Sequence, residues 1–244
     1  DQPARRVHQA VGIDHLDDQL PGGGRQPGAV EREGDVAAQG ERQVVAQRHP
    51  LLRFEGAEAL ERGADFVWLF NYDAQAAPDS LSLLIDTASS HQEAGLLSPA
   101  ITDQHGKAWF AKGQIDFLRM RAIHIRPEPR ELAAGAYPSR FLTGCALLIR
   151  RDVFEKIGFL DERFFLYYED ADFCLRAANA GFGCLIVPGA RVKHTEISSE
   201  NPEKTYHLVY SGLIFSKQHA PRILKPWLAG YATIRRLKNR FDRL

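Results

Sequence analysis

The first 53 residues contain no phenylalanine, tyrosine or tryptophan, although the whole chain has 14, 7 and 3 of them. This opening stretch is rich in glycine, glutamine, arginine and alanine, and it follows neither a helical nor a strand period. A segment so poor in large apolar side chains builds little core. Two interpretations stay open for it: a disordered leader, or a stretch translated from a shifted reading frame.

The chain also lacks a net charge, a long apolar run and paired cysteines. Its 31 basic and 31 acidic residues cancel, which argues against a general nucleic-acid-binding protein. No apolar run approaches the roughly 20 residues of a membrane-spanning helix, and we see no export signal. Cys145, Cys174 and Cys184 have no CxxC spacing and lie in apolar surroundings, which indicates reduced core thiols. We therefore expect a cytoplasmic protein.

From Glu61 onward, short apolar runs alternate with helical patterns. The patterns predict strands at residues 65–70, 95–101, 141–149 and 184–188, and helices that begin near Pro78, Asp152 and Asp170. Asp152 and Glu155 have the spacing of a capping box, and Gly158 and Gly181 are placed to end helices. This alternation predicts an α/β fold with a mostly parallel or mixed sheet covered on both faces.

Polar residues that follow the predicted strands are the first site candidates, because ligands of open α/β sheets bind beyond the strands' carboxyl ends. Asp73 follows the strand at 65–70, next to Asn71, and offers carboxylate oxygens to Mg²⁺ or Mn²⁺ beside a phosphate. The alternative is a simple Asx turn. His194 follows a later strand and is either a metal ligand or a surface histidine.

A second group of candidates is acidic. Glu169, Asp170 and Asp172 directly follow the aromatic run at residues 164–168. A carboxylate held beside apolar surface at a helix start can act as a general base. The alternative is that the three acids only cap the helix and favour its dipole.

Taken together, residues 63–215 resemble glycosyltransferase family two, particularly its bacterial rhamnosyltransferase-like and galactofuranosyltransferase-like members. The motif of the first strand, similar to that family's metal and diphosphate motif in its Asn-x-Asp form, is ADFVWLFNYDA. The longer match, which includes a Glu-Asp-x-Asp base motif and a later histidine, is FLTGCALLIRRDVFEKIGFLDERFFLYYEDADFCLRAANAGFGCLIVPGARVKHTEIS.

The resemblance implies a GT-A-like, Rossmann-type mixed sheet flanked by helices. It also implies a metal-dependent, inverting hexosyltransferase of polysaccharide biosynthesis in the bacterial cell envelope. Such an enzyme moves a rhamnose-like sugar from a dTDP- or UDP-linked donor to a hydroxyl of a glycan or lipid-linked acceptor.

Roles for single residues follow from the same resemblance. Asp73, with Asn71 beside it, and His194 hold Mg²⁺ or Mn²⁺ on the diphosphate, while Asp170 is the general base with Glu169 as its neighbour. The residues that line the sugar and acceptor side are Trp109, Thr143, Gly144 and Tyr168.

The sequence also departs from the family. We find no first βαβ unit among residues 1–60, and Tyr210-Ser211 stands where similar enzymes often carry an Arg-Asn pair. We therefore divide the chain into an atypical segment at 1–55, an incomplete catalytic domain at 56–221 and a tail at 222–244. The alternative function is a truncated or degenerate transferase that acts only as a glycan-binding or scaffold domain. A metal-dependent phosphohydrolase is disfavoured, because the sequence supplies no two-metal carboxylate cluster.

The tail is strongly basic. It has a single acid, Asp242, against seven cations: Arg222, Lys225, Arg235, Arg236, Lys238, Arg240 and Arg243. Its interspersed apolar residues predict an amphipathic helix on an anionic membrane surface, at the cytoplasmic face of the inner membrane. The alternative is a terminal helix whose apolar face packs on the domain.

Overall fold

The computed structural model describes residues 7–12, 51–195 and 202–241. The strands are β1 (Val7–Gly12), β2 (Phe66–Asn71), β3 (Ala74–Ala76), β4 (Ala94–Thr102), β5 (Ala108–Phe110), β6 (Gly113–Asp116), β7 (Arg121–His124), β8 (Tyr137–Pro138), β9 (Ala146–Arg150) and β10 (Gly183–His194). The helices are α1 (Leu51–Glu61), α2 (Ser80–Ser90), α3 (Pro129–Ala133), α4 (Arg151–Ile157), α5 (Glu169–Asn179), α6 (Pro202–His219), the short 3₁₀ helix η1 (Arg222–Leu224) and α7 (Lys225–Phe241).

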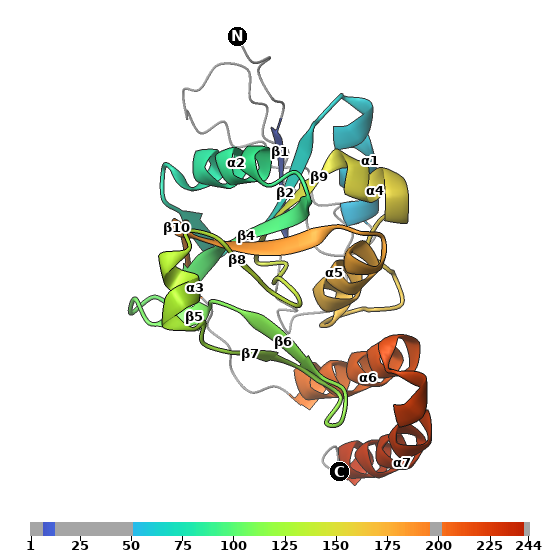
Figure 1. The fold of residues 1–244 in the computed structure, drawn as a ribbon. Helices are drawn as coiled ribbons and strands as arrows, with labels where there is room; N and C mark the ends of the chain where they lie inside the picture. Colours follow the sequence, from blue (N-terminus) through green and yellow to red (C-terminus); the bar gives the residue numbers. More distant parts are fainter. Residues whose placement is uncertain (1–6, 13–50, 196–201, 242–244) are drawn as a thin grey trace, which may run out of the picture.

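The main sheet has the strand order β1-β2-β9-β4-β10-β3, with β5 beside β4 and β8 beside β10 (Figure 1). β1 runs parallel to β2 and β4 runs parallel to β10, whereas β9 is antiparallel to both of its neighbours. Helices flank this sheet, and the hairpin β6-β7 lies apart from it, near α6 (Figure 1). The expected mixed α/β sheet is therefore confirmed.

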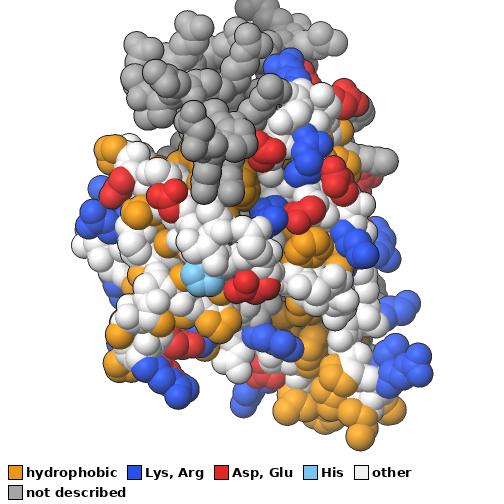
Figure 2. Space-filling view, turned by 45° about the horizontal axis from the view of Figure 1, so that its top comes forward, with side chains coloured by type: hydrophobic (Ala, Val, Ile, Leu, Met, Phe, Trp, Pro, Cys, Tyr) orange, Lys and Arg blue, Asp and Glu red, His pale blue; other side chains and the backbone are white. Residues whose placement is uncertain are grey.

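The buried strands explain the apolar runs of the sequence. Every residue of β2 is buried, and β4 and β9 are buried along most of their length, so these strands do not alternate between apolar and polar residues. Cys145, Cys174 and Cys184 are buried and form no disulfide in the described part of the chain, as expected of core thiols. Burial raises the pKa of the Cys174 thiol well above its usual value. Charges of both signs are scattered over the face shown in Figure 2.

Two local expectations need correction. The strand predicted at residues 141–149 begins only at Ala146, because the preceding residues leave the sheet and bond to α5. The capping box at Asp152 and Glu155 is wrong. Arg150 is the N-cap of α4 and makes no side-chain cap bond, since the helix follows directly from β9. Gly158 and Gly181 do end helices, with φ of 72° and 98°.

Structured elements also precede residue 60. β1 pairs in parallel with β2 from Val7 opposite Phe66 to Gly12 opposite Asn71, and α1 comes between them in the chain. A β-α-β order therefore opens the described chain, where we expected the first such unit to be missing. Backbone pairing at the end of a sheet does not require large apolar side chains, so composition did not show this strand. Residues 13–50, which carry most of the atypical composition, lie outside the described residues.

A second, smaller apolar cluster joins the hairpin to the last two helices. Met120, which follows β6, packs with Leu213 of α6 and with Ala220 and Leu228. Among the described helices, none is both long and apolar enough to pass through a bilayer.

Candidate active site

Sheet pairing brings Asp73 and His194 together across 121 positions of sequence. Asp73 lies in the turn after β2, and β3 pairs antiparallel with β10 so that Ala74 stands opposite His194. Nε2 of His194 is 3.1 Å from Oδ1 of Asp73, and the histidine is only 3% exposed. The Thr195 N–H donates to the Asp73 carbonyl at 3.0 Å, which fixes the turn. The structure thus brings the carboxylate and the imidazole into contact, and the metal-binding role that the resemblance implies for them stays a prediction.

Trp109 covers His194. The two ring centroids lie 4.5 Å apart at an interplanar angle of 56°. On another side, the His124 ring meets Trp109 at 5.4 Å, and His124 Nδ1 lies 3.2 Å from the Trp109 carbonyl oxygen. Trp109 therefore belongs to the surroundings of the Asp73–His194 pair and holds the imidazole in place.

Asn71 is the last residue of β2 and is only 2% exposed. Its N–H donates to the Cys145 carbonyl at 2.9 Å. Among the described residues, no donor reaches its buried side-chain oxygen. A buried acceptor left unmet costs about 1–3 kcal/mol, so this amide oxygen is available to a ligand or a water.

Residues 143–145, which we call the strap, join the end of β2 to the start of α5. The Gly144 N–H donates to Oδ2 of Asp170 at 3.0 Å, while the Cys145 carbonyl accepts the Asn71 N–H. Thr143 Oγ1 accepts the Cys145 N–H at 3.3 Å and so folds the strap on itself. Asn71 and Asp170, two site candidates far apart in sequence, are therefore connected through three residues.

Asp170 is held at both carboxylate oxygens. Oδ2 accepts from Gly144, and Oδ1 accepts the Ala171 N–H at 2.7 Å. The residue is only partly buried, at the first turn of α5, with Glu169 directly before it. A carboxylate oriented in this way, and open to solvent, can accept a proton from a bound hydroxyl.

The backbone before Asp170 is in an unusual conformation. Tyr167 and Tyr168 both adopt left-handed backbone angles, with φ of 66° and 70°, which costs energy for residues other than glycine. The Tyr168 hydroxyl donates to the Met120 carbonyl at 3.1 Å, and a Cβ on Gly212 would lie 3.2 Å from the tyrosine ring. Tyr168 is 6% exposed, so in this structure its side chain packs inside the protein and anchors the segment that carries Asp170.

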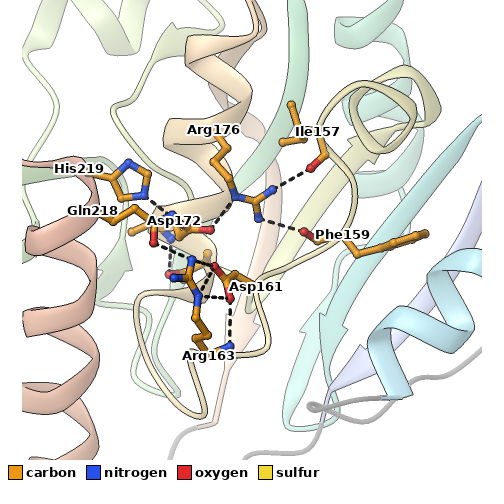
Figure 3. A network of polar contacts seen from close by, with 10 residues as sticks. Ile157, Phe159, Asp161, Arg163, Asp172, Arg176, Gln218 and His219 are labelled. Atoms are coloured by element: carbon orange, nitrogen blue, oxygen red, sulfur yellow. Dashed lines mark hydrogen bonds and ion pairs between the residues drawn. The ribbon is translucent and has the colours of Figure 1, made fainter.

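A buried network that sequence reasoning only partly identified is centred on Asp172, two residues after Asp170 in the chain (Figure 3). Asp172 is fully buried and accepts from Arg176 Nε, four residues later in α5, at 2.7 Å. It also contacts two residues of α6, accepting from Gln218 at 3.0 Å and lying 2.6 Å from His219 Nε2. Arg176 donates further to two carbonyl oxygens in the segment 157–159. The local sequence around Asp172 does not predict its α6 partners, because they lie 46 and 47 residues away.

Asp161 and Arg163 extend this network toward the surface (Figure 3). The Arg163 guanidinium donates to both carboxylate oxygens of Asp161 and holds the pKa of that carboxyl below its usual value. It also donates to Gln218 at 2.9 Å. The start of α5 is therefore tied to α6 by a chain of charged and amide groups.

The donor set near Asp73 fits part of a divalent cation site. Asp73 supplies an oxygen and His194 a nitrogen, and the described residues hold no cluster of three histidine, cysteine or acidic side chains. Mg²⁺ at nucleotide sites commonly has one or two protein carboxylates, with phosphate and water oxygens in the remaining positions. The pair therefore suits a cation that arrives with a diphosphate.

Residues 66–214, more than half of the chain, match the protein family described as glycosyl transferase family group 2. A curated relative in Mycobacterium tuberculosis, N-acetylglucosaminyl-diphospho-decaprenol L-rhamnosyltransferase, is 34% identical over 157 residues, which cover 59% of this chain and 51% of the relative. The dTDP-rhamnosyl transferase RfbF of Shigella flexneri is 23% identical over 179 residues, or 68% of this chain and 58% of that protein. The chain thus spans about half the length of the curated relatives it matches.

Two solved structures resemble the chain more distantly. GalNAc-T7 with UDP, GalNAc and Mn²⁺ has a TM-score of 0.49 and 18% identity, covering 70% of this chain and 36% of that one. The mannosyltransferase PcManGT from Pyrobaculum calidifontis, in complex with GDP-Man and Mn²⁺, has a TM-score of 0.46 and 15% identity, covering 83% of this chain and 54% of that one.

Proposed function

The chain belongs to glycosyl transferase family group 2, and we propose that it is an inverting transferase that moves a rhamnose-like sugar from a nucleotide-diphosphate donor. The names of its relatives support our choice of sugar and donor. Two of them are rhamnosyltransferases, and the name of one is dTDP-rhamnosyl transferase. The acceptor we propose is a hydroxyl of a cell-envelope glycan or lipid-linked glycan, since the mycobacterial relative's name includes a diphospho-decaprenol. Such an acceptor would be met at the cytoplasmic face of a membrane.

One observation carries this proposal: the strap binds the Asp170 carboxylate at Gly144 and the end of β2 at Cys145. Sugar transfer from a nucleotide needs a proton acceptor on one side and neutralised diphosphate on the other. Asp170 suits the first need, and the Asp73–His194 pair suits the second. The strap bonds Asp170 to Asn71 at the end of β2, two residues before Asp73.

In the proposed reaction, the acceptor hydroxyl attacks the anomeric carbon while its proton passes to Asp170. The bond between that carbon and the diphosphate breaks, and the nucleoside diphosphate leaves with the bonding electrons. Two backbone N–H groups keep the carboxylate of Asp170 oriented, so little reorganisation accompanies proton transfer. Attack from the face opposite the leaving group inverts the anomeric centre.

Asp73 and His194 would hold Mg²⁺ or Mn²⁺. When bound, the cation stabilises the charge that develops on the leaving diphosphate. Trp109 keeps the imidazole of His194 turned toward Asp73, and the amide oxygen of Asn71 is an additional unmet acceptor beside the strap. These residues do not need a third acidic side chain if the diphosphate supplies oxygen ligands.

Calorimetric titration of the full chain with dTDP and UDP, with and without Mn²⁺, tests the donor site. We expect Mn²⁺-dependent binding that Asp73→Ala and His194→Ala each weaken at least about tenfold, because each removes one ligand of the cation. Glu155→Gln on α4, where the side chain is 59% exposed, is the matched control and should bind like the parent chain.

Mn²⁺-independent binding, or equal binding by all variants, would contradict the metal assignment. No binding of either nucleotide by a folded protein would favour the alternative of a glycan-binding or scaffold domain. A dTDP-rhamnose assay with a diphospholipid-linked N-acetylglucosamine acceptor, read by the anomeric configuration of the product, then tests the transfer itself.

A further inference from the structure

Two segments far apart in sequence form one exposed apolar surface at the end of the molecule that holds α7. Leu118, at the turn of the β6-β7 hairpin, is 57% exposed, and Trp227 and Ile234 of α7 are 56% and 64% exposed. The Trp227 Nε1–H donates to the Leu118 carbonyl at 3.1 Å, which fastens the helix to the hairpin. Figure 2 shows hydrophobic side chains gathered at this lower end of the molecule, with Lys and Arg side chains on both sides.

The helical spacing places three large apolar side chains of α7 on one side, two of them exposed and Tyr231 partly buried. Trp227, Tyr231 and Ile234 are at i, i+4 and i+7, and the rings of the first two stack with centroids 6.0 Å apart. Leu228, by contrast, is buried against Met120 and Leu213. One side of the helix therefore packs on the protein, as the alternative for the tail expected, and another side is left open.

Two arginines line this open side. A shallow groove of ≈ 570 Å³ is lined by Leu118, Arg119, Arg121, Trp227 and Tyr231. Arg119 pairs with Asp116, whereas the exposed Arg121 has no ion pair within the described residues. The sequence of α7 adds four cations between positions 235 and 240 and no acid. Because the whole chain is neutral, this end carries a local positive excess.

We propose that the hairpin turn and α7 form a docking face for the surface of an anionic lipid bilayer. The docking face consists of Leu118, Arg121, Trp227, Tyr231 and Ile234. Exposed aliphatic and aromatic side chains beside arginine, on a helix whose sequence adds further cations, suit the boundary between acyl chains and acidic headgroups, where each cation near the surface contributes to binding. The charge of the face, rather than its apolar area alone, points to this occupant and not to a second copy of the same cationic surface.

The docking face is linked to the segment of Asp170. Met120 lies between Arg119 and Arg121, and its carbonyl accepts the Tyr168 hydroxyl two residues before Asp170. A protein docked in this way would present its base-bearing segment close to the bilayer, where a lipid-linked acceptor resides. This last step rests on the proposed function, whereas the docking itself does not.

Sedimentation with vesicles tests the docking face. The full chain is mixed with vesicles of phosphatidylcholine alone or of phosphatidylcholine with about 30 mole per cent phosphatidylglycerol. This anionic content gives the vesicles a strong negative surface potential. We expect binding to the anionic vesicles, weakened by high salt. Leu118→Glu and Ile234→Glu should each reduce the partition coefficient at least about tenfold, and Arg121→Glu about fivefold or more.

The matched controls lie on or beside α3. Leu132→Glu replaces a leucine that is 53% exposed, and Arg130→Glu replaces an arginine whose side chain is 82% exposed; both should bind like the parent chain. Circular dichroism and thermal melting verify that each variant is folded.

Three results would overturn the proposal: equal binding to neutral and anionic vesicles, an equal loss of binding in the control variants, or no vesicle binding by the folded parent chain. So would a stable dimer that Ile234→Glu dissociates while vesicle binding is absent. Calorimetry with dTDP is measured separately, so failure of the donor site is distinguishable from failure of docking.

Discussion

Backbone N–H groups hold both oxygens of the partly buried Asp170 carboxylate. Capping alone explains one such bond at a helix start, but not the second bond to a segment 26 residues earlier. That long-range bond orients the side chain independently of α5. At the scale of the residue, this bond to the strap is more than helix capping requires, and the general-base role of Asp170 stays a prediction.

Asp170→Asn should lower the rate of transfer by about 10²–10⁴, because the amide keeps the shape of the side chain but accepts no proton from the attacking hydroxyl. Affinity for dTDP in the presence of Mn²⁺ should change little, since Asp170 does not belong to the Asp73–His194 pair. Initial rates with a saturating acceptor and calorimetry on the same preparation measure the two quantities. Glu155→Gln serves as the control, and a transfer rate that Asp170→Asn leaves intact would refute the base assignment.

At the scale of the element, α5 depends on partners that its own sequence does not specify. Asp172 has no exposed surface, and within the described part of the chain its carboxyl group contacts Arg176, Gln218 and His219. Two of these partners come from the end of α6 (Figure 3). The network therefore sets how α6 lies against the helix that carries Asp170.

Asp172→Ala should lower the free energy of unfolding by about 3–5 kcal/mol, because it leaves the partly buried Arg176 without its carboxylate. Urea denaturation followed by circular dichroism measures this change. Asp79→Ala is the control: Asp79 is the exposed N-cap residue of α2 and makes no side-chain cap bond, so its loss should cost less than about 0.5 kcal/mol. If the two variants unfold at comparable urea concentrations, the network contributes little to the free energy of unfolding.

The elements that sequence alone predicted are those with strong local patterns. The aromatic run of β2, the glycine at the end of α4 and the acidic first turn of α5 are each visible within a few residues. The start of β9 was missed because residues 141–145 are as apolar as a strand, yet the bond from Gly144 to Asp170 pulls them out of the sheet. The Asp73–His194 contact was expected only through the family resemblance, since strand pairing across 121 positions leaves no local signal.

At the scale of the whole molecule, the least expected feature is the pairing of β1 with β2. The six residues of β1 are VHQAVG, which neither alternate nor form an apolar run, so only the partner strand identifies them as a strand. With β1 in place, β2 has a neighbour on each side, and its end at Asn71 lies inside the sheet rather than at an edge. A site built on the end of β2 is more rigid when β2 is paired on both sides than when it is an edge strand.

Hydrogen exchange can test this pairing directly. Neighbouring strands bond to alternate backbone groups of β2, so one set of its amides depends on β1 and the other set on β9. Removal of residues 1–12 should speed exchange at the first set by at least about tenfold, while amides that donate to β9 stay protected. Removal of residues 1–6 alone leaves β1 intact and is the matched control. If both truncations exchange like the full chain, β1 does not pair with β2 in solution. If only the longer truncation exchanges faster, β1 pairs with β2 in solution. Calorimetry with dTDP and Mn²⁺ on that variant then tests the site, and a loss of binding would show that Asp73 depends on β1 as the outer neighbour of β2.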